Sequence, residues 1–188
     1  MTTAYDSTSL RSAFSASAVT QTVRQLLEKT KTATRTNWLR AVAALTTNER
    51  PDLAEAITAY LGVSGTIDGS NPLEHRTIGE IGVCYEALVA MSDRTSRKAA
   101  GQYFTPDDTA HFMAQQSADF PEGTWMDPCC GVGNLAWHLA AAQEDPARFV
   151  REHLVLLDID ETALRTAVVL IAADFLAIGD LDGFQALQ

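Results

Sequence analysis

The stretch DPCCGVGNL, Asp127–Leu135, constrains the fold of this chain more than any other. It follows the segment GTWMDP, which predicts a short buried strand ending at Asp127, and it precedes a helix expected from about Asn134 to Ala142. The nearly continuous apolar run HLVLLDID predicts a second strand of a parallel sheet, and a long helix is expected from about Glu161. Strand, glycine loop, helix, strand and helix together predict a β-α-β-α unit and an α/β fold.

The glycine loop is the first candidate site, because ligands of such units bind at the carboxyl ends of the strands. Gly131 and Gly133 lack a Cβ, which lets the backbone approach a ligand closely. Their spacing to Ala136 also fits the G-x-G-x-x-A fingerprint, so a dinucleotide-binding domain stays open as an alternative. A carboxylate at Asp127 would repel a pyrophosphate and attract an ammonium group, which favours a cationic or zwitterionic ligand.

Two further segments suggest what that ligand contains. Asp158 ends the second strand, where an acid accepts hydrogen bonds from the hydroxyls of a ribose. Asp160 is expected to cap the next helix, with a metal-binding Asp-x-Asp pair as a rival interpretation. Thr105 is expected to cap a helix whose free N–H groups suit a carboxylate. An ammonium, a carboxylate and a ribose occur together in S-adenosylmethionine, with Ile159 placed to pack on its adenine.

Helical periodicity dominates the first half of the chain. Residues 1–16 are expected to form a disordered tail, residues 17–92 a small helical domain, and residues 93–188 the start of a second domain. Four apolar stripes predict four helices whose marked residues form a core: Val19, Val23, Leu26 and Leu27; Trp38, Leu39, Val42 and Leu45; Leu53, Ile57, Tyr60 and Leu61; and Ile78, Ile81, Tyr85, Leu88 and Val89.

The overall charge argues against a chain that grips DNA by itself. The formal net charge is -10, and phosphate contacts normally require a basic face. The one locally basic stretch is Asp93–Lys98, so contact with DNA would need a local patch or another protein segment. We find neither a signal peptide nor an apolar run long enough for a membrane span, and therefore expect a cytoplasmic protein without a membrane partner.

The cysteines and histidines do not form a recognisable metal or disulfide pattern. Cys84, Cys129 and Cys130 are an odd number, and the four histidines are scattered, so we expect no disulfide framework and no metal site. We expect the adjacent pair Cys129 and Cys130 to be small packing residues.

The order GQYFTP, DPCCGVGNL and LLDID resembles the adenine-specific amino DNA methyltransferases. The similarity is greatest to the modification subunits of type I restriction systems and their type II relatives. It covers roughly Ile78 to Phe175, where the stretch IGEIGVCYEALV resembles the helix before the first motif. The resemblance implies an N-terminal helical domain followed by an incomplete Rossmann-like methyltransferase domain with S-adenosylmethionine as cofactor.

The resemblance also implies a set of cofactor-binding residues. The methionine part would be held by Tyr103, Phe104 and Thr105, and the ribose by Asp158 with Ile159 as its apolar neighbour. The remaining positions belong to the glycine loop and the helix that it opens: Asp127, Gly131, Gly133, Asn134 and Leu135.

The catalytic tetrapeptide of the family, Asn/Asp-Pro-Pro-Tyr/Phe, is absent from this sequence. It would hold the adenine that is flipped out of the duplex. Asn71-Pro72, Asp127-Pro128 and Asp145-Pro146 each continue with another residue type, so no catalytic residue is assigned, and no third strand is expected before Gln188.

Three explanations remain open for this absence. The chain is the N-terminal part of a longer enzyme, a split enzyme completed by another chain or by self-association, or a non-catalytic regulatory or assembly relative. In the first two cases we expect an enzyme of a restriction-modification or phage-defence system. DNA would then be bound by the missing part or by a specificity subunit.

Overall fold

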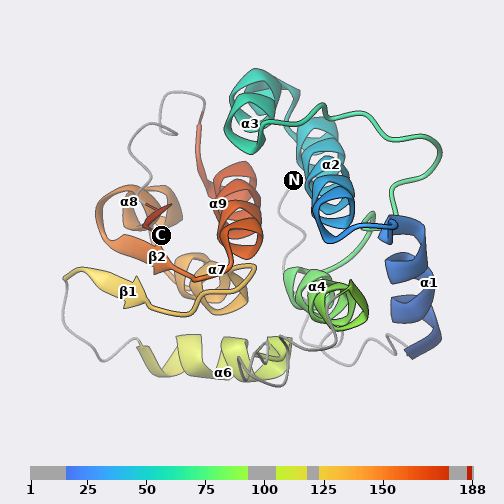
Figure 1. Cartoon of the computed structure of the whole chain (residues 1–188). Helices are drawn as coiled ribbons and strands as arrows, with labels where there is room; N and C mark the ends of the chain where they lie inside the picture. The colour runs from blue at the N-terminus through green and yellow to red at the C-terminus, as the bar shows by residue number, and fades with distance from the viewer. Residues whose placement is uncertain (1–15, 93–104, 118–122, 178–185, 188) are drawn as a thin grey trace.

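The computed structural model describes residues 16–92, 105–117, 123–177 and 186–187, and this part is mostly helical (Figure 1). The predicted disordered tail lies outside the described residues except for Ala16, which begins the first helix. The elements in chain order are α1 (Ala16–Leu26), α2 (Lys31–Glu49), a 3-10 turn (Pro51–Leu53), α3 (Ala54–Leu61), α4 (Ile78–Ser92), α6 (Asp107–Gln116), β1 (Trp125–Asp127), α7 (Asn134–Ala141), α8 (Pro146–Glu152), β2 (Leu154–Leu157), α9 (Glu161–Phe175) and β3 (Ala186–Leu187).

The strands form a small parallel sheet in the order β1-β2-β3. Asp127 is paired with Leu156, so β1 and β2 end side by side. The alternation of strand, loop, helix, strand and helix over this region is confirmed. One expectation is wrong, because a third strand, β3, pairs with β2. Helix α8 was not predicted. The mixture of helices with a parallel sheet agrees with an α/β class, and the wider Rossmann-like architecture stays a prediction.

The four helices predicted before residue 93 are confirmed, but Tyr60 of α3, expected in the core, is 42% exposed. Local signals explain several of the helix ends. Thr30 caps α2 by accepting a hydrogen bond from the N–H of Ala33 at 3.2 Å. Gly62, with φ 65°, ends α3 in the left-handed conformation that glycine adopts at little cost. Thr77 and Glu80 form a capping box at the start of α4, since each side chain accepts from the other's N–H at 3.2 Å.

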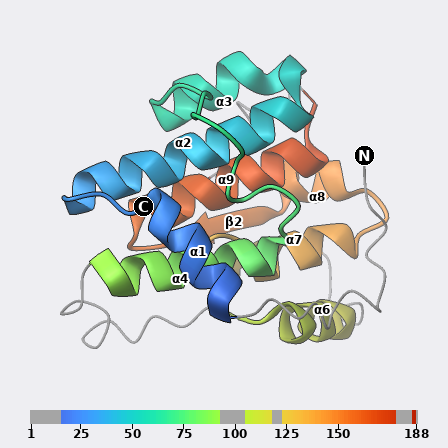
Figure 2. The same cartoon turned by 90° about the vertical axis from the view of Figure 1, so that its right-hand side faces the viewer.

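Helix α9 joins the helical segment to the sheet. Figure 2 shows α2 running alongside α9, and their facing side chains share one buried cluster. Trp38 of α2 and Tyr85 of α4 meet in it with ring centroids 4.9 Å apart, and the indole N–H of Trp38 donates to Thr166 Oγ1 at 2.9 Å. The opposite side of α9 packs on β2 through Leu156, Leu164 and Ile171. The boundary between residues 17–92 and 93–188 therefore stays a prediction.

Among the described residues, no helix combines the length and apolar character that crossing a bilayer requires.

Candidate functional site

The glycine loop lies beyond the carboxyl ends of β1 and β2. The N–H of Cys130 donates to Leu157 O at 2.9 Å, which anchors the loop to β2. Gly131 and Gly133 have φ values of 56° and 91°, conformations that residues with a Cβ rarely adopt. The N–H of Gly131 donates to Asp158 Oδ2 at 2.7 Å. The loop and the acid that follows β2 are thus brought together as the sequence suggested.

Gly133 faces protein and not open space. A Cβ at this position would lie 2.9 Å from the Cβ of Ala167 and 3.2 Å from Cδ1 of Ile171, both on α9. We expected this glycine to let a ligand approach the backbone, but the space beside it is occupied by α9. Its missing side chain lets the start of α7 pack against α9.

Asp158 and Asp160 have separate roles. Asp158 Oδ1 accepts from the N–H of Asp160 at 2.7 Å, and its Oδ2 accepts from Gly131. A carboxylate has about four lone-pair sites, so acceptor capacity remains for ligand hydroxyls. Asp160 Oδ1 accepts from the N–H groups of Thr162 and Ala163, which confirms it as the cap of α9. Within the described ranges, no group of three or more potential ligands could hold a metal ion.

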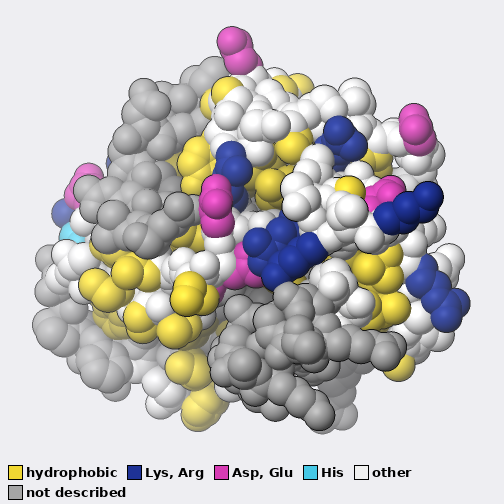
Figure 3. All heavy atoms as spheres, viewed as in Figure 1, with side chains coloured by type: hydrophobic (Ala, Val, Ile, Leu, Met, Phe, Trp, Pro, Cys, Tyr) yellow, Lys and Arg dark blue, Asp and Glu magenta, His cyan; other side chains and the backbone are white. Residues whose placement is uncertain are grey.

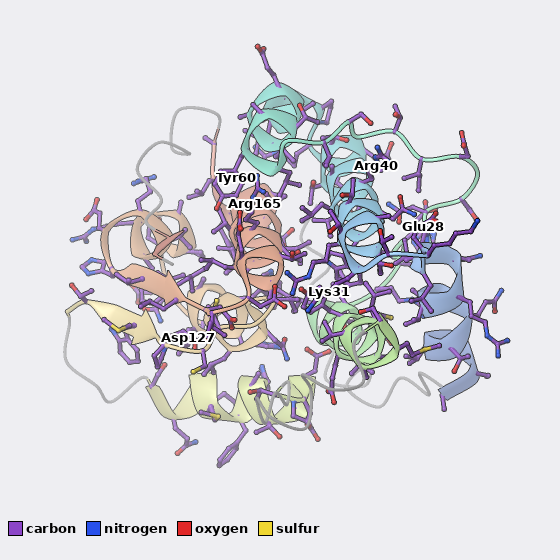
Figure 4. The ribbon with its side chains drawn as sticks, in the orientation of Figure 1. Glu28, Lys31, Arg40, Tyr60, Asp127 and Arg165 are labelled. Atoms are coloured by element: carbon purple, nitrogen blue, oxygen red, sulfur yellow. The ribbon has the colours of Figure 1, made fainter. Side chains whose placement is uncertain are left out.

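Asp127 gives the loop a second carboxylate. It lies at the end of β1, as Figure 4 shows, and its Oδ1 accepts from the N–H of Cys129 at 3.3 Å. Burial raises the pKa of Asp127, and the nearby charge of Asp158 raises it further. The charged form of Asp127 is therefore under-solvated, and a cation brought to it would be stabilised.

Thr105 does not cap the following helix. Pro106 occupies the N-cap position of α6 and makes no side-chain cap, so the expectation for Thr105 was wrong by one residue. The carbonyl of Thr105 instead accepts from Asn134 Nδ2 at 2.7 Å. This bond joins the segment before α6 to the first residue of α7.

Asn134 has a buried acceptor that is not used. The residue is 4% exposed, and its Oδ1 has no hydrogen-bond partner among the residues that the structure describes. A buried amide oxygen without a partner costs free energy, which suggests that a ligand group completes it. Leu135, which follows it, is partly buried against the cluster around β2.

The other predicted positions differ in how the structure bears on them. Ile159 is 95% exposed, and its expected contact with an adenine stays a prediction. Tyr103 and Phe104 lie outside the described residues. Cys130 is buried, which raises the pKa of its thiol, whereas Cys129 is exposed, so only one of the pair is the expected packing residue.

The polar cluster that holds α6 in place was not predicted from the sequence. Asp107 Oδ2 accepts from Thr77 Oγ1 at 2.6 Å, and its Oδ1 lies 3.4 Å from Nε2 of the buried His138. A Cβ on Gly79 would overlap the Asp107 carboxylate. The capping box at Thr77 and the acidic first turn of α6 were available signals, but their meeting depends on the tertiary fold. This cluster fixes α6 on α4 and α7, and so positions Thr105.

A comparison with known families agrees with this geometry. Residues 76–165, just under half of the chain, match the family model described as N-6 DNA methylase. No curated protein and no solved structure shows a significant match. The matched range runs from the start of α4 into α9, and includes the glycine loop, Asn134 and Asp158. The match over this range supports an adenine N6 DNA methyltransferase-like protein.

Proposed function

We propose that this chain supplies the cofactor-binding part of a DNA adenine N6-methyltransferase that uses S-adenosylmethionine. The observation that carries the proposal is the 2.7 Å hydrogen bond between Gly131 N–H and Asp158 Oδ2. This bond brings the glycine loop next to Asp158, the acid proposed to bind the ribose. A second bond of 2.7 Å, from Asn134 Nδ2 to Thr105 O, brings the end of the GQYFTP segment to the same loop.

The chemistry of these residues fits the proposed cofactor. Asp127 offers a partly desolvated carboxylate to an ammonium group. Asp158 keeps acceptor sites for two ribose hydroxyls, and Asn134 Oδ1, which has no partner within the described part of the chain, offers a further acceptor beside the loop. Ile159 is exposed beside Asp158, where it can cover one face of an adenine. S-adenosylmethionine, when bound, supplies a methyl group on a sulfonium that an amine can accept.

The same residues disfavour a dinucleotide. Asp127 and Asp158 place two carboxylates at the loop, and a pyrophosphate there would be repelled by both. Ala167 of α9 occupies the space that the missing side chain of Gly133 leaves. The G-x-G-x-x-A spacing is thus accounted for without a pyrophosphate at this residue.

Transfer of the methyl group to DNA requires residues that this sequence does not contain. The tetrapeptide that would hold a flipped adenine is absent from the 188 residues. We propose that it comes from a further segment or a complementing chain, and that a specificity subunit or that segment contacts DNA. The setting would be a cytoplasmic restriction-modification or phage-defence system.

The alternative function is a non-catalytic regulatory or assembly module of such a system that keeps a partial cofactor pocket. The absent tetrapeptide favours it. Reading the gene beyond the Gln188 codon separates the two: an in-frame Asn-Pro-Pro-Tyr/Phe supports the enzyme, and an immediate stop codon argues against the longer-enzyme version.

Calorimetric titration of the full chain tests cofactor binding directly. S-adenosylhomocysteine, the demethylated product, should bind, whereas NAD should give no heat of binding. Binding of NAD without S-adenosylhomocysteine would replace the proposal with a dinucleotide-binding domain. Binding of neither would reject a cofactor role for the loop.

A further inference from the structure

We propose that Arg35, on α2 of the helical segment, is a positioning residue of the cofactor site. It holds Asp158 in the orientation that a ribose requires, and it acts through Asp160. The inference rests on the proposed function, since it names the source of ribose recognition. It assigns a role to a segment whose sequence shows only core-forming stripes.

The first link is an ion pair between segments that are far apart in sequence. Arg35 Nη2 lies 3.0 Å from Asp160 Oδ2, and the Asp160 side chain is only 6% exposed. The other oxygen, Oδ1, is already engaged by the N–H groups that begin α9. Arg35 therefore engages the remaining oxygen, Oδ2, so that both carboxylate oxygens of Asp160 accept hydrogen bonds.

The second link runs from Asp160 to the glycine loop. The N–H of Asp160 donates to Asp158 Oδ1 at 2.7 Å, and Asp158 Oδ2 accepts from Gly131 at 2.7 Å. Arg35, Asp160, Asp158 and Gly131 are thus linked by a series of hydrogen bonds, to which Asp160 contributes its side chain toward Arg35 and its backbone N–H toward Asp158. Rotation of the Asp158 carboxylate would break a bond at one or both ends.

The surroundings of Asp160 make Arg35 hard to replace. The buried Tyr85 of α4 faces the same carboxylate: burial raises the pKa of Tyr85, and the charge of Asp160 raises it further. On the face of the molecule that Figure 3 shows, Lys and Arg side chains lie against Asp and Glu side chains near the centre. Without Arg35, Asp160 would remain a buried charge next to Asp158, and both would move toward water.

The matched control lies on the same helix. Arg40 is exposed and its Nη1 reaches only Asn37 Oδ1 at 3.4 Å among the contacts described, well away from Asp127 (Figure 4). Arg40→Ala removes the same charge from α2 without touching this series of hydrogen bonds. Arg35→Lys keeps the charge but loses the planar fork that suits a carboxylate.

The test compares S-adenosylhomocysteine with its 2′-deoxyribose analogue on the full chain. Arg35→Ala should weaken S-adenosylhomocysteine binding by about 3–10-fold and shrink the preference for the 2′-hydroxyl by a similar factor. Arg35→Lys should retain part of that preference, and Arg40→Ala should leave it unchanged. An equal loss of affinity for both ligands, or no loss, would overturn the positioning role.

A second readout does not depend on the ligand. Arg35→Ala should speed hydrogen exchange of the Gly131 amide by about tenfold relative to Arg40→Ala, because its acceptor is no longer held. An unchanged rate at Gly131 would overturn the inference even if the proposed function stands. If the wild-type chain binds neither ligand, the proposed function fails, and the exchange rate alone decides the role of Arg35.

Discussion

Gly131 and Asp158 are joined by a 2.7 Å hydrogen bond from the loop N–H to the carboxylate Oδ2. The two residues lie 27 positions apart, each just beyond the end of a parallel strand. Asp158 therefore has a structural role in addition to its proposed contact with a ribose. Any substitution of Asp158 should affect both the stability of the loop and the binding of ligand.

Asp158→Ala should reduce both properties. It leaves the N–H groups of Gly131 and Asp160 without their acceptor, at a cost of about 2–4 kcal/mol in the free energy of unfolding. In a chain of this length the melting temperature should fall by about 5–10 °C. Affinity for S-adenosylhomocysteine should fall by about 10–100-fold in calorimetry.

Asp145→Ala is the matched control for Asp158→Ala. Asp145 is an exposed acid that accepts from the N–H of Arg148 at 2.9 Å and caps α8. Its loss should cost about 1 kcal/mol of stability and leave ligand affinity unchanged. Unaltered binding by a folded Asp158→Ala variant would show that the ribose assignment is wrong.

Asp127→Asn should separate stability from binding. The folded-state pKa of Asp127 is raised by burial, so the stability contributed by this group declines as pH rises from the ordinary Asp value through the raised one. Asn keeps the acceptor for Cys129 and removes the charge. The variant should therefore be at least as stable as the wild type at neutral pH, by thermal melting, with no advantage at pH values below both pKa values.

The same substitution should weaken S-adenosylhomocysteine binding by about 10-fold or more, because a charged partner of the ammonium is lost. Wild-type affinity should also decrease as pH falls through the raised pKa of Asp127. A variant that loses stability at neutral pH, or binds as the wild type does, would contradict the role given to this carboxylate.

Gly133→Ala should destabilise the fold by about 2–4 kcal/mol, since it combines a positive φ with overlap against α9. Gly69→Ala isolates the first effect, because Gly69 has φ 82° and nothing within 4 Å of an added Cβ. That control should cost only about 1 kcal/mol in urea unfolding. Equal losses for the two variants would mean that Gly133 is not needed for packing on Ala167.

Thr166→Val should show whether the helical segment and α9 unfold together. It removes the acceptor of the buried Trp38 N–H, which costs about 1–3 kcal/mol. Thr36→Val is the control, because the Thr36 hydroxyl bonds only within its own helix among the contacts described, to Thr32 O. We expect a single melting transition, lowered as a whole by Thr166→Val. Two transitions, with only one shifted, would indicate independent domains.

Helices and strands with strong periodicity could be predicted from the sequence. The apolar stripes of α1 to α4 and the apolar runs of β1 and β2 arise because each element must bury one face, and this leaves a pattern within the segment itself. The short α8 was missed although Asp145-Pro146 is a favourable start for a helix. The two-residue β3 has too few residues to produce a pattern.

The site divides in the same way. The proximity of Asp127, the glycines and Asp158 could be predicted because each lies at or just beyond the end of a strand of the predicted β-α-β-α unit, and parallel strands end at the same edge of a sheet. Three contacts could not be predicted, because they depend on how helices far apart in the sequence pack together. They are the packing of Gly133 on Ala167, the cluster around Asp107 and the pair of Arg35 with Asp160. Only the tertiary fold brings these groups together.

Hydrogen exchange of the full chain with and without S-adenosylhomocysteine tests the central claim most directly. The three motif segments should bind one ligand, so peptides covering residues 105–110, 129–135 and 157–162 should gain protection together. A peptide covering α3, residues 54–61, should not change. Protection confined to one of the three segments, or absent from all of them, would contradict a single methyl-donor pocket.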